Sequence, residues 1–215
     1  MGSDIELAET VLRAIGATSI EYCLVAFDEL LTGVNEDRWD LNVPIFVTPE
    51  RARQVAFSVP VWALGDGLLV ANGNPKHLTS YQGIAAVDEV RLGVIPGQVQ
   101  IDAASSAGVA DRQLVTFATQ QEAISALRAG RIDAFAATGV GNRAVVQVGA
   151  GLSAVDIETP AGRSAPVGAF SVARTNLSLL DALNSELRSY LGTPDHRTRM
   201  AAHGITAVEI DPVLG

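Results

Sequence analysis

Residues 44–62, which read PIFVTPERARQVAFSVPVW, decide the fold of this chain. An apolar run at residues 43–47 leads into Thr48 and Pro49, and this order predicts a strand followed by a helix. Thr48 would cap the helix, and Pro49 suits its first position because proline has no backbone N–H to leave unpaired there. The stretch therefore predicts one strand–helix unit of an α/β protein.

Arg51 falls in the first turn of this predicted helix. The positive end of the helix dipole and the unpaired N–H groups already attract anions there, so an arginine adds to an anion-binding position. A solvated arginine on a helix face would give the same sequence. Arg51 is thus a candidate anion-binding residue, with a plain surface role as the alternative.

Outward from this stretch, predicted strands and helices alternate. Towards the N-terminus, a helix is predicted at residues 4–15, a strand at 20–25 and a helix at 27–34. Towards the C-terminus, strands are predicted at 67–71, 91–95, 114–117, 132–136 and 167–172, and helices at 120–129, 179–191 and 197–202 and after Gly97-Gln98. Residues 153–166 read as an irregular connection. The alternation predicts an α/β fold with mostly parallel sheets and helices on both faces.

The composition narrows the classes of partner. The chain has 215 residues, 48% of them hydrophobic, and can bury a sizeable core. Its formal net charge of −9 offers no basic surface to nucleic acid or to an anionic membrane, so small molecules or proteins are the expected partners. Cys23 is the single cysteine and is expected in the core. No apolar run approaches the roughly 20 residues of a membrane span, and no signal peptide is recognised.

The phrase TPER followed by RARQVAFSVPVW resembles the T-x-E-R…V-x-F-S-x-P signature of bacterial extracellular solute-binding proteins of family 3. The resemblance implies a two-lobed, type II periplasmic-binding-protein-like fold, with lobe I at residues 1–70 and 171–215 and lobe II inserted at 71–170. It also implies ligand capture by hinge closure, a location in the periplasm or outside the cell, and the membrane subunits of an ABC importer as protein partner.

The same resemblance suggests ligand-binding residues. It gives Arg51 a bidentate salt bridge to a ligand carboxylate, for which a planar guanidinium is well suited. Phe27 and Phe46 would contribute aromatic walls, although either ring could be ordinary core. The backbone N–H groups at Gly97 and Gln98 would meet a carboxylate at a helix start.

Thr138 and the adjacent Gly139 complete the predicted set. The resemblance places Thr138 where amino-acid receptors carry an aspartate for the ligand's α-ammonium, and threonine supplies no charge. A delocalised cation held by aromatic faces would fit this neutral position. Ectoine and hydroxyectoine have such a cation, and IFVTPERARQVAFS is similar to a stretch of ectoine-binding receptors. Gly139, Val140 and Gly141 follow a predicted strand and fit a turn better than a phosphate cradle.

Two alternatives stay open at this stage: a polar amino-acid receptor of the same family, and a receptor-derived enzyme of the dehydratase type. No catalytic or dinucleotide fingerprint is present. His77, His196 and His203 are far apart in the sequence and are expected at the surface. We therefore expect a binding protein that uses no cofactor and no metal and is not an enzyme.

The start of the chain differs from the family pattern. A strand and a ligand-contact loop normally precede the segment that GSDIELAETVLRAIG resembles. Either the start is misassigned or the first lobe lacks its first strand. In the second case an unpaired sheet edge would favour association, whereas a chain extended at its N-terminus is expected to be monomeric.

Overall fold

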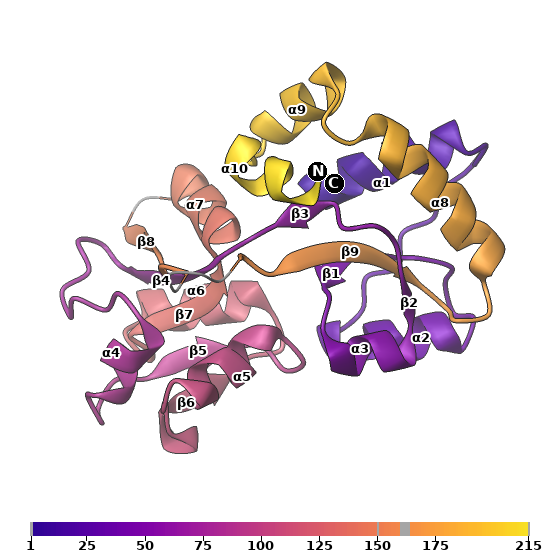
Figure 1. Cartoon of the computed structure of the whole chain (residues 1–215). Coiled ribbons are helices and arrows are strands. Elements are labelled where there is room, and N and C mark those ends of the chain that lie inside the picture. The colour runs from indigo at the N-terminus through magenta and orange to yellow at the C-terminus, as the bar shows by residue number, and fades with distance from the viewer. Residues whose placement is uncertain (1, 150, 160–163, 215) are drawn as a thin grey trace. The chain divides into compact units, whose positions relative to one another are not determined.

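The computed structural model describes residues 2–149, 151–159 and 164–214. They form two compact units (Figure 1). Unit 1 comprises Met1–Val25, Glu29–Leu64 and Ala165–Gly215, and unit 2 comprises Ala26–Asp28 and Gly65–Ser164. The units differ from the predicted lobes at their boundaries, because the chain passes from unit 1 to unit 2 between Leu64 and Gly65, and residues 26–28 belong to unit 2.

Unit 1 is built on one sheet in which every described pairing involves β9 (Val167–Val172). Its partners β1 (Asn42–Phe46), β2 (Ala56–Phe57) and β3 (Trp62–Ala63) all run antiparallel to it. The helices of the unit are α1 (Ser3–Ala14), α2 (Leu30–Asn35), α3 (Pro49–Gln54), α8 (Leu177–Tyr190), α9 (Pro194–Ala201) and α10 (Ala207–Ile210), followed by the 3-10 turn η3 (Asp211–Val213).

The stretch that decides the fold adopts the predicted strand–helix unit. β1 ends at Phe46, and α3 begins with Pro49 at its first position. The Arg51 backbone N–H donates to Thr48 Oγ1 at 3.2 Å, so one of the N–H groups that a helix start leaves unpaired is satisfied. The cap and the proline set the direction in which the chain leaves β1.

Unit 2 is a five-stranded sheet of order β6-β5-β7-β4-β8 (Figure 1). Its strands are β4 (Asp66–Ala71), β5 (Leu92–Val94), β6 (Leu114–Thr116), β7 (Ala134–Thr138) and β8 (Leu152–Asp156). Its helices are α4 (Tyr81–Ala85), α5 (Val99–Ser106), α6 (Gln120–Arg128) and α7 (Gly139–Val148), with the 3-10 turn η2 (Asp111–Gln113). A further turn, η1 (Phe27–Glu29), begins in this unit.

Both faces of the unit 2 sheet are covered, as alternation along β4 requires. Leu68 and Val70 pack with α4 and α5 in one hydrophobic cluster, whose members include Tyr81 and Ala104. Leu69 points to the opposite face and packs in a second cluster with residues of α6. The α/β class with helices on both faces is therefore confirmed.

The expectation of mostly parallel sheets is wrong for the described strands. Only β5 pairs in parallel, with β6 and with β7. The pairings of β9 with β1, β2 and β3, and of β4 with β7 and β8, are antiparallel. The reason is that β4 and β9 run against the strands beside them, which local sequence patterns do not reveal.

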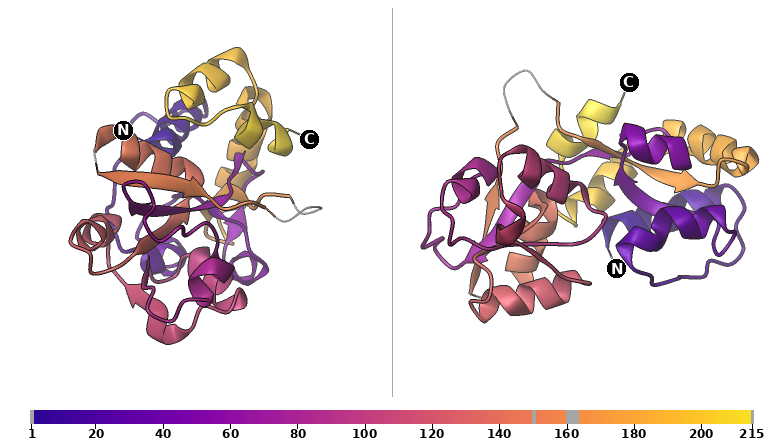
Figure 2. Two further views of the ribbon diagram at one scale, coloured as in Figure 1. Left: turned by 90° about the vertical axis from the view of Figure 1, so that its left-hand side faces the viewer. Right: turned by 90° about the horizontal axis from the view of Figure 1, so that it is seen from below.

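Residues 20–25 do not form the predicted strand. A strand needs a neighbour for its backbone hydrogen bonds, and none of the described strands pairs with this segment. Its apolar side chains are therefore left in solvent: Tyr22 is 56% exposed and Leu24 is fully exposed. Cys23 is also exposed, so its expected place in the core is a second correction. The segment is the indigo coil that follows α1 in Figure 2.

Two further expectations are corrected. The irregular connection predicted at residues 153–166 contains most of β8, which pairs with β4, while residues 160–163 lie outside the described part of the chain. His196 is fully buried instead of lying at the surface, and its Nδ1 accepts a hydrogen bond from the Gly192 backbone N–H at 3.1 Å. Burial lowers the pKa of His196, because desolvation disfavours the charged ring.

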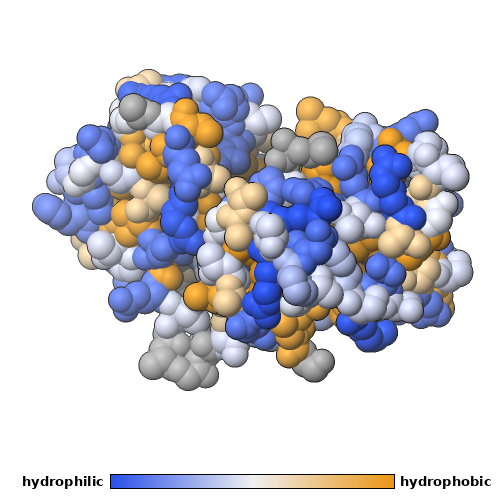
Figure 3. Space-filling view, turned by 90° about the horizontal axis from the view of Figure 1, so that it is seen from above, coloured by the Kyte–Doolittle hydropathy of each residue, from blue (hydrophilic) through white to orange (hydrophobic). Residues whose placement is uncertain are grey.

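Hydrophilic and hydrophobic residues are mixed on the face of the molecule seen in Figure 3. Among the described residues, no helix has both the length and the apolar character needed to cross a membrane.

Candidate functional site

Arg51 is a buried cation on α3 in unit 1. Only 8% of the residue is exposed, and a guanidinium Nη1–H donates to the backbone carbonyl of Phe46 at 2.7 Å. This hydrogen bond ties the side chain back to the end of β1 and fixes the plane of its fork. Burial of an arginine is costly unless its charge has polar partners, and in the described part of unit 1 Arg51 is the only arginine or lysine among the buried residues.

Phe46 lies five positions before Arg51 and is joined to it through its backbone carbonyl, but its ring is mostly enclosed. It is 8% exposed and packs edge-on against Trp62, with ring centroids 5.1 Å apart and planes at 83°. The Trp62 indole N–H donates to Asp4 Oδ1 at 3.1 Å. Within unit 1, Phe46 therefore helps to hold the Arg51 region in place as part of an aromatic pair. Its predicted role as a wall of the ligand site stays a prediction.

Phe27 and Gly97 come together in unit 2. Gly97 has a φ of +78°, and an added Cβ would lie 3.3 Å from Asp28 Cα and 3.4 Å from the Phe27 ring. Both the backbone angle and the close approach favour glycine at this position. Gln98 follows as the N-cap of α5, and its own N–H donates to the Ile95 carbonyl at 3.2 Å. The start of α5 is thus fixed against η1.

Thr138 and Gly139 form the start of α7 instead of the expected turn. Thr138 Oγ1 accepts from the Gly141 N–H at 3.1 Å, and the Gly139 N–H donates to the Gly65 carbonyl at 3.0 Å. An added Cβ at Gly139 would come within 2.2 Å of a carboxylate oxygen of Asp156. Because these two N–H groups are already used and an acid lies alongside, the start of α7 is poorly suited to an anion.

Asp66 is a charged group of this region that the sequence did not reveal. It stands directly opposite Thr138 in the antiparallel pairing of β4 with β7. Gln100 Nε2 donates to Asp66 Oδ1 at 2.7 Å, and the Tyr81 hydroxyl donates to Oδ2 at 3.0 Å. Burial raises the pKa of Asp66, while the hydrogen bonds from Gln100 and Tyr81 lower it. Only the register of β4 against β7 could have pointed to this residue.

The predicted residues therefore fall into two groups. Arg51 and Phe46 lie in unit 1, and Phe27, Gly97, Gln98, Thr138 and Gly139 lie in unit 2. In unit 2, β5 and β7 are parallel. Gly97 follows the end of β5 and Thr138 ends β7, so both residues lie at the carboxyl edge of the sheet. Ligands of α/β proteins commonly bind at this edge.

A sequence model of the bacterial extracellular solute-binding proteins, family 3, matches residues 1–191. The chain belongs to this family. A relative from Sinorhizobium fredii (strain NBRC 101917 / NGR234), described as a probable amino-acid ABC transporter periplasmic-binding protein y4tE, is 27% identical over 215 residues. That match covers 94% of this chain and 69% of the relative.

Solved structures of solute-binding proteins share the fold of this family 3 chain. EhuB in complex with hydroxyectoine superposes with a TM-score of 0.85 at 19% identity, covering 100% of this chain and 86% of that one. An ancestral arginine-binding protein bound to glutamine gives 0.83 at 23% identity, with 94% and 87% covered. The type II periplasmic-binding-protein-like fold is confirmed. The family is one of solute-binding proteins and not of enzymes, which agrees with the sequence-based expectation.

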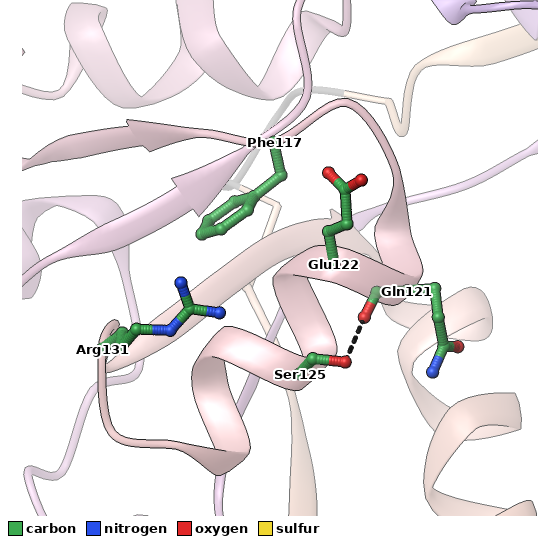
Figure 4. A pocket seen from close by; sticks show the side chains of 5 residues that line it. All are labelled: Phe117, Gln121, Glu122, Ser125 and Arg131. Carbon is green, nitrogen blue, oxygen red and sulfur yellow. Dashed lines mark hydrogen bonds between the residues drawn. The ribbon is translucent and has the colours of Figure 1, made fainter.

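A surface pocket of about 280 Å³ in unit 2 of this solute-binding protein lies apart from the predicted residues. Figure 4 shows its lining side chains, which come from α6 and from the segments on either side of it: Phe117, Gln121, Glu122, Ser125 and Arg131. Two of them form hydrogen bonds with the backbone in or next to α6: Glu122 accepts from the Ala118 N–H, and Ser125 donates to the Gln121 carbonyl. In the described part of the chain, no group of His, Cys, Asp and Glu residues is arranged to hold a metal ion.

Proposed function

We propose that this family 3 protein is the solute-binding component of an ABC importer and captures a small zwitterionic solute, with ectoine or hydroxyectoine as the first candidates. The membrane subunits of the importer would be its protein partner, and the periplasm its location. Capture by closure of the two units around the ligand also stays a prediction.

The observation that carries the proposal is the burial of Arg51 in the family's signature stretch. A planar guanidinium that a hydrogen bond ties to the Phe46 carbonyl would suit a carboxylate received through two parallel hydrogen bonds. The fold of EhuB, seen with hydroxyectoine, supports the first candidates only through overall similarity.

A polar amino acid is the second candidate, and one structural observation favours it. The neutral Thr138 argued for a delocalised cation, but Asp66 stands opposite Thr138 in the sheet. An acid thus stands opposite the position that the resemblance assigns to the ligand's ammonium group, and such a charge would suit a compact ammonium. The relative from Sinorhizobium fredii is described as an amino-acid transporter component, which is consistent with this candidate.

A thermal-shift screen with ectoine, hydroxyectoine, arginine, glutamine and glutamate tests the proposal. A ligand that binds only the folded state adds about 2.7 kcal/mol of stability at a hundred times its dissociation constant. We expect ectoine or hydroxyectoine to raise the melting temperature and the three amino acids to leave it unchanged.

Each other result has a defined meaning. A shift with an amino acid and none with the ectoines would replace the compatible solute by an amino acid as ligand. No shift with any of the five compounds, checked by calorimetric titration, would contradict the zwitterion proposal itself. Small-angle X-ray scattering with and without the ligand that binds then tests closure.

A further inference from the structure

We propose that Asp66 supplies the negative charge that pairs with the cationic group of the solute, and so determines which zwitterions bind. The inference rests on the proposed function and deepens it. It assigns the cation end of the ligand to unit 2, at the edge of the sheet where β4 begins and β7 ends.

The strand register places Asp66 with the predicted ligand residues. Directly opposite residues of an antiparallel pair share one face of the sheet, so Asp66 and Thr138 lie on the same face. Two and four residues further along β4, Leu68 and Val70 pack on this face with α4 and α5. The hydrogen bond from Gln100 to Asp66 also joins this carboxylate to the first turn of α5, which follows Gly97 and Gln98.

The partners of Asp66 leave its charge without a counterion. Gln100 and Tyr81 are neutral donors, one to each carboxylate oxygen. Among the described residues, no Lys, Arg or His forms a salt bridge with Asp66. A carboxylate can accept about four hydrogen bonds, so each oxygen retains capacity for a ligand N–H. A half-buried anion held in a fixed orientation without a cation is costly alone and is relieved by a cationic ligand.

The same register explains why position 138 is neutral. Like charges directly opposite each other in a strand pair destabilise the sheet, so an acid at 138 would be unfavourable while Asp66 is ionised. The threonine hydroxyl instead caps α7 through the Gly141 N–H. Aspartate is an equally good N-cap residue, so Thr138→Asp can keep the cap and differ mainly in charge.

The test measures dissociation constants calorimetrically for whichever of the five screened compounds binds the wild-type protein. Asp66→Asn should weaken binding by roughly 30-fold or more, the fold-change that corresponds to about 2 kcal/mol. Its melting temperature without ligand should be equal to or above that of the wild type, because the substitution removes a desolvated charge. The double variant Asp66→Asn, Thr138→Asp moves the acid across the strand pair and should recover at least part of the affinity.

Asp88→Asn is the matched control, because Asp88 is an exposed acid of unit 2 that forms an ion pair with Arg112 and touches none of the predicted ligand residues. It should leave the dissociation constant within about twofold of the wild type, as expected of a surface ion pair. If the wild type binds and Asp66→Asn binds equally well, the inference fails while the proposed function stands. If the wild type binds none of the compounds, the proposed function fails and the inference falls with it.

Discussion

A lysine at position 51 would keep the positive charge and lose the planar fork. Because a carboxylate held bidentately by Arg51 would then be poorly paired, Arg51→Lys should cost on the order of 2–5 kcal/mol of binding free energy. Calorimetric titration with the ligand from the screen measures the loss. Arg53→Lys is the control, since Arg53 is exposed on the same helix. Equal affinity of Arg51→Lys and wild type would remove Arg51 from the site.

The raised pKa of Asp66 has a consequence for stability. Because burial raises this pKa in the folded state, the folded protein binds this proton more readily than the unfolded chain does. The cost of the ionised carboxylate is therefore fully present above the folded-state pKa. It fades as the pH falls towards the ordinary aspartate value, about 3.9. Asp66→Asn should raise the free energy of unfolding relative to wild type near neutrality, and this advantage should shrink in acid.

Urea unfolding of both proteins across this pH range measures the difference in their free energies of unfolding, in which the contributions of the titratable groups that the two proteins share cancel. A difference that stays constant with pH would show that Asp66 titrates normally.

At the residue scale, the sequence predicted Arg51 but not Asp66, for a physical reason. The cap, the proline and the arginine lie within four consecutive positions, so local chemistry marks them. Asp66 is a candidate only because of its neighbours in the folded chain. The strand register places Thr138 opposite it, and α4 and α5 supply its hydrogen-bond donors Tyr81 and Gln100. A single sequence does not specify that register.

At the element scale, the close packing of α7 on β4 depends on Gly67. An added Cβ there would lie 2.8 Å from the Gly139 Cα and 3.0 Å from the Val155 carbonyl oxygen, and real Cβ atoms essentially never come within 3.0 Å of a neighbour. Since both contacts involve backbone, Gly67→Ala should shift α7 and lower the free energy of unfolding by about 1–3 kcal/mol.

Gly83→Ala is the control for this prediction, because Gly83 lies in the short helix α4, where an added Cβ would make only an ordinary contact with Ser80 at 3.4 Å. Alanine favours a helix over glycine, so this variant should be neutral or slightly more stable. Thermal and urea unfolding compare the two. A Gly67→Ala protein as stable as wild type would mean that α7 adapts without cost.

Most elements were predictable because their signals are local. The helix at α1, the strand β9 and the capped α3 were confirmed close to their predicted bounds. Residues 20–25 carry an equally good local strand pattern, yet they pair with none of the described strands. Local pattern reports what a segment is able to form, whereas a strand also requires a neighbour.

At the scale of the whole molecule, the resemblance predicted two lobes, the first interrupted in sequence by the second, and the signature stretch carried that inference. The direction of the strands was not predictable, since β4 and β9 pair with strands from distant parts of the chain. Periodicity indicates which residues are buried but not which strand lies alongside.

The sheet of unit 1 is held together by β9, which is the last of its strands in the sequence. This late position affects the order in which the chain can fold. As the protein is synthesised, Gly65–Ser164 emerges before β9, so nearly all of unit 2 is complete while β1, β2 and β3 still lack their described partner. The same order is expected when the full chain refolds, because β5 pairs with β7 across 42 residues (Leu92 with Ala134), whereas β1 pairs with β9 across 129 (Asn42 with Ser171), and contacts between distant residues form slowly. Pulse-labelling hydrogen exchange during refolding should therefore protect the amides of β5 and β7 before those of β1. Simultaneous protection would show that the two units fold as one.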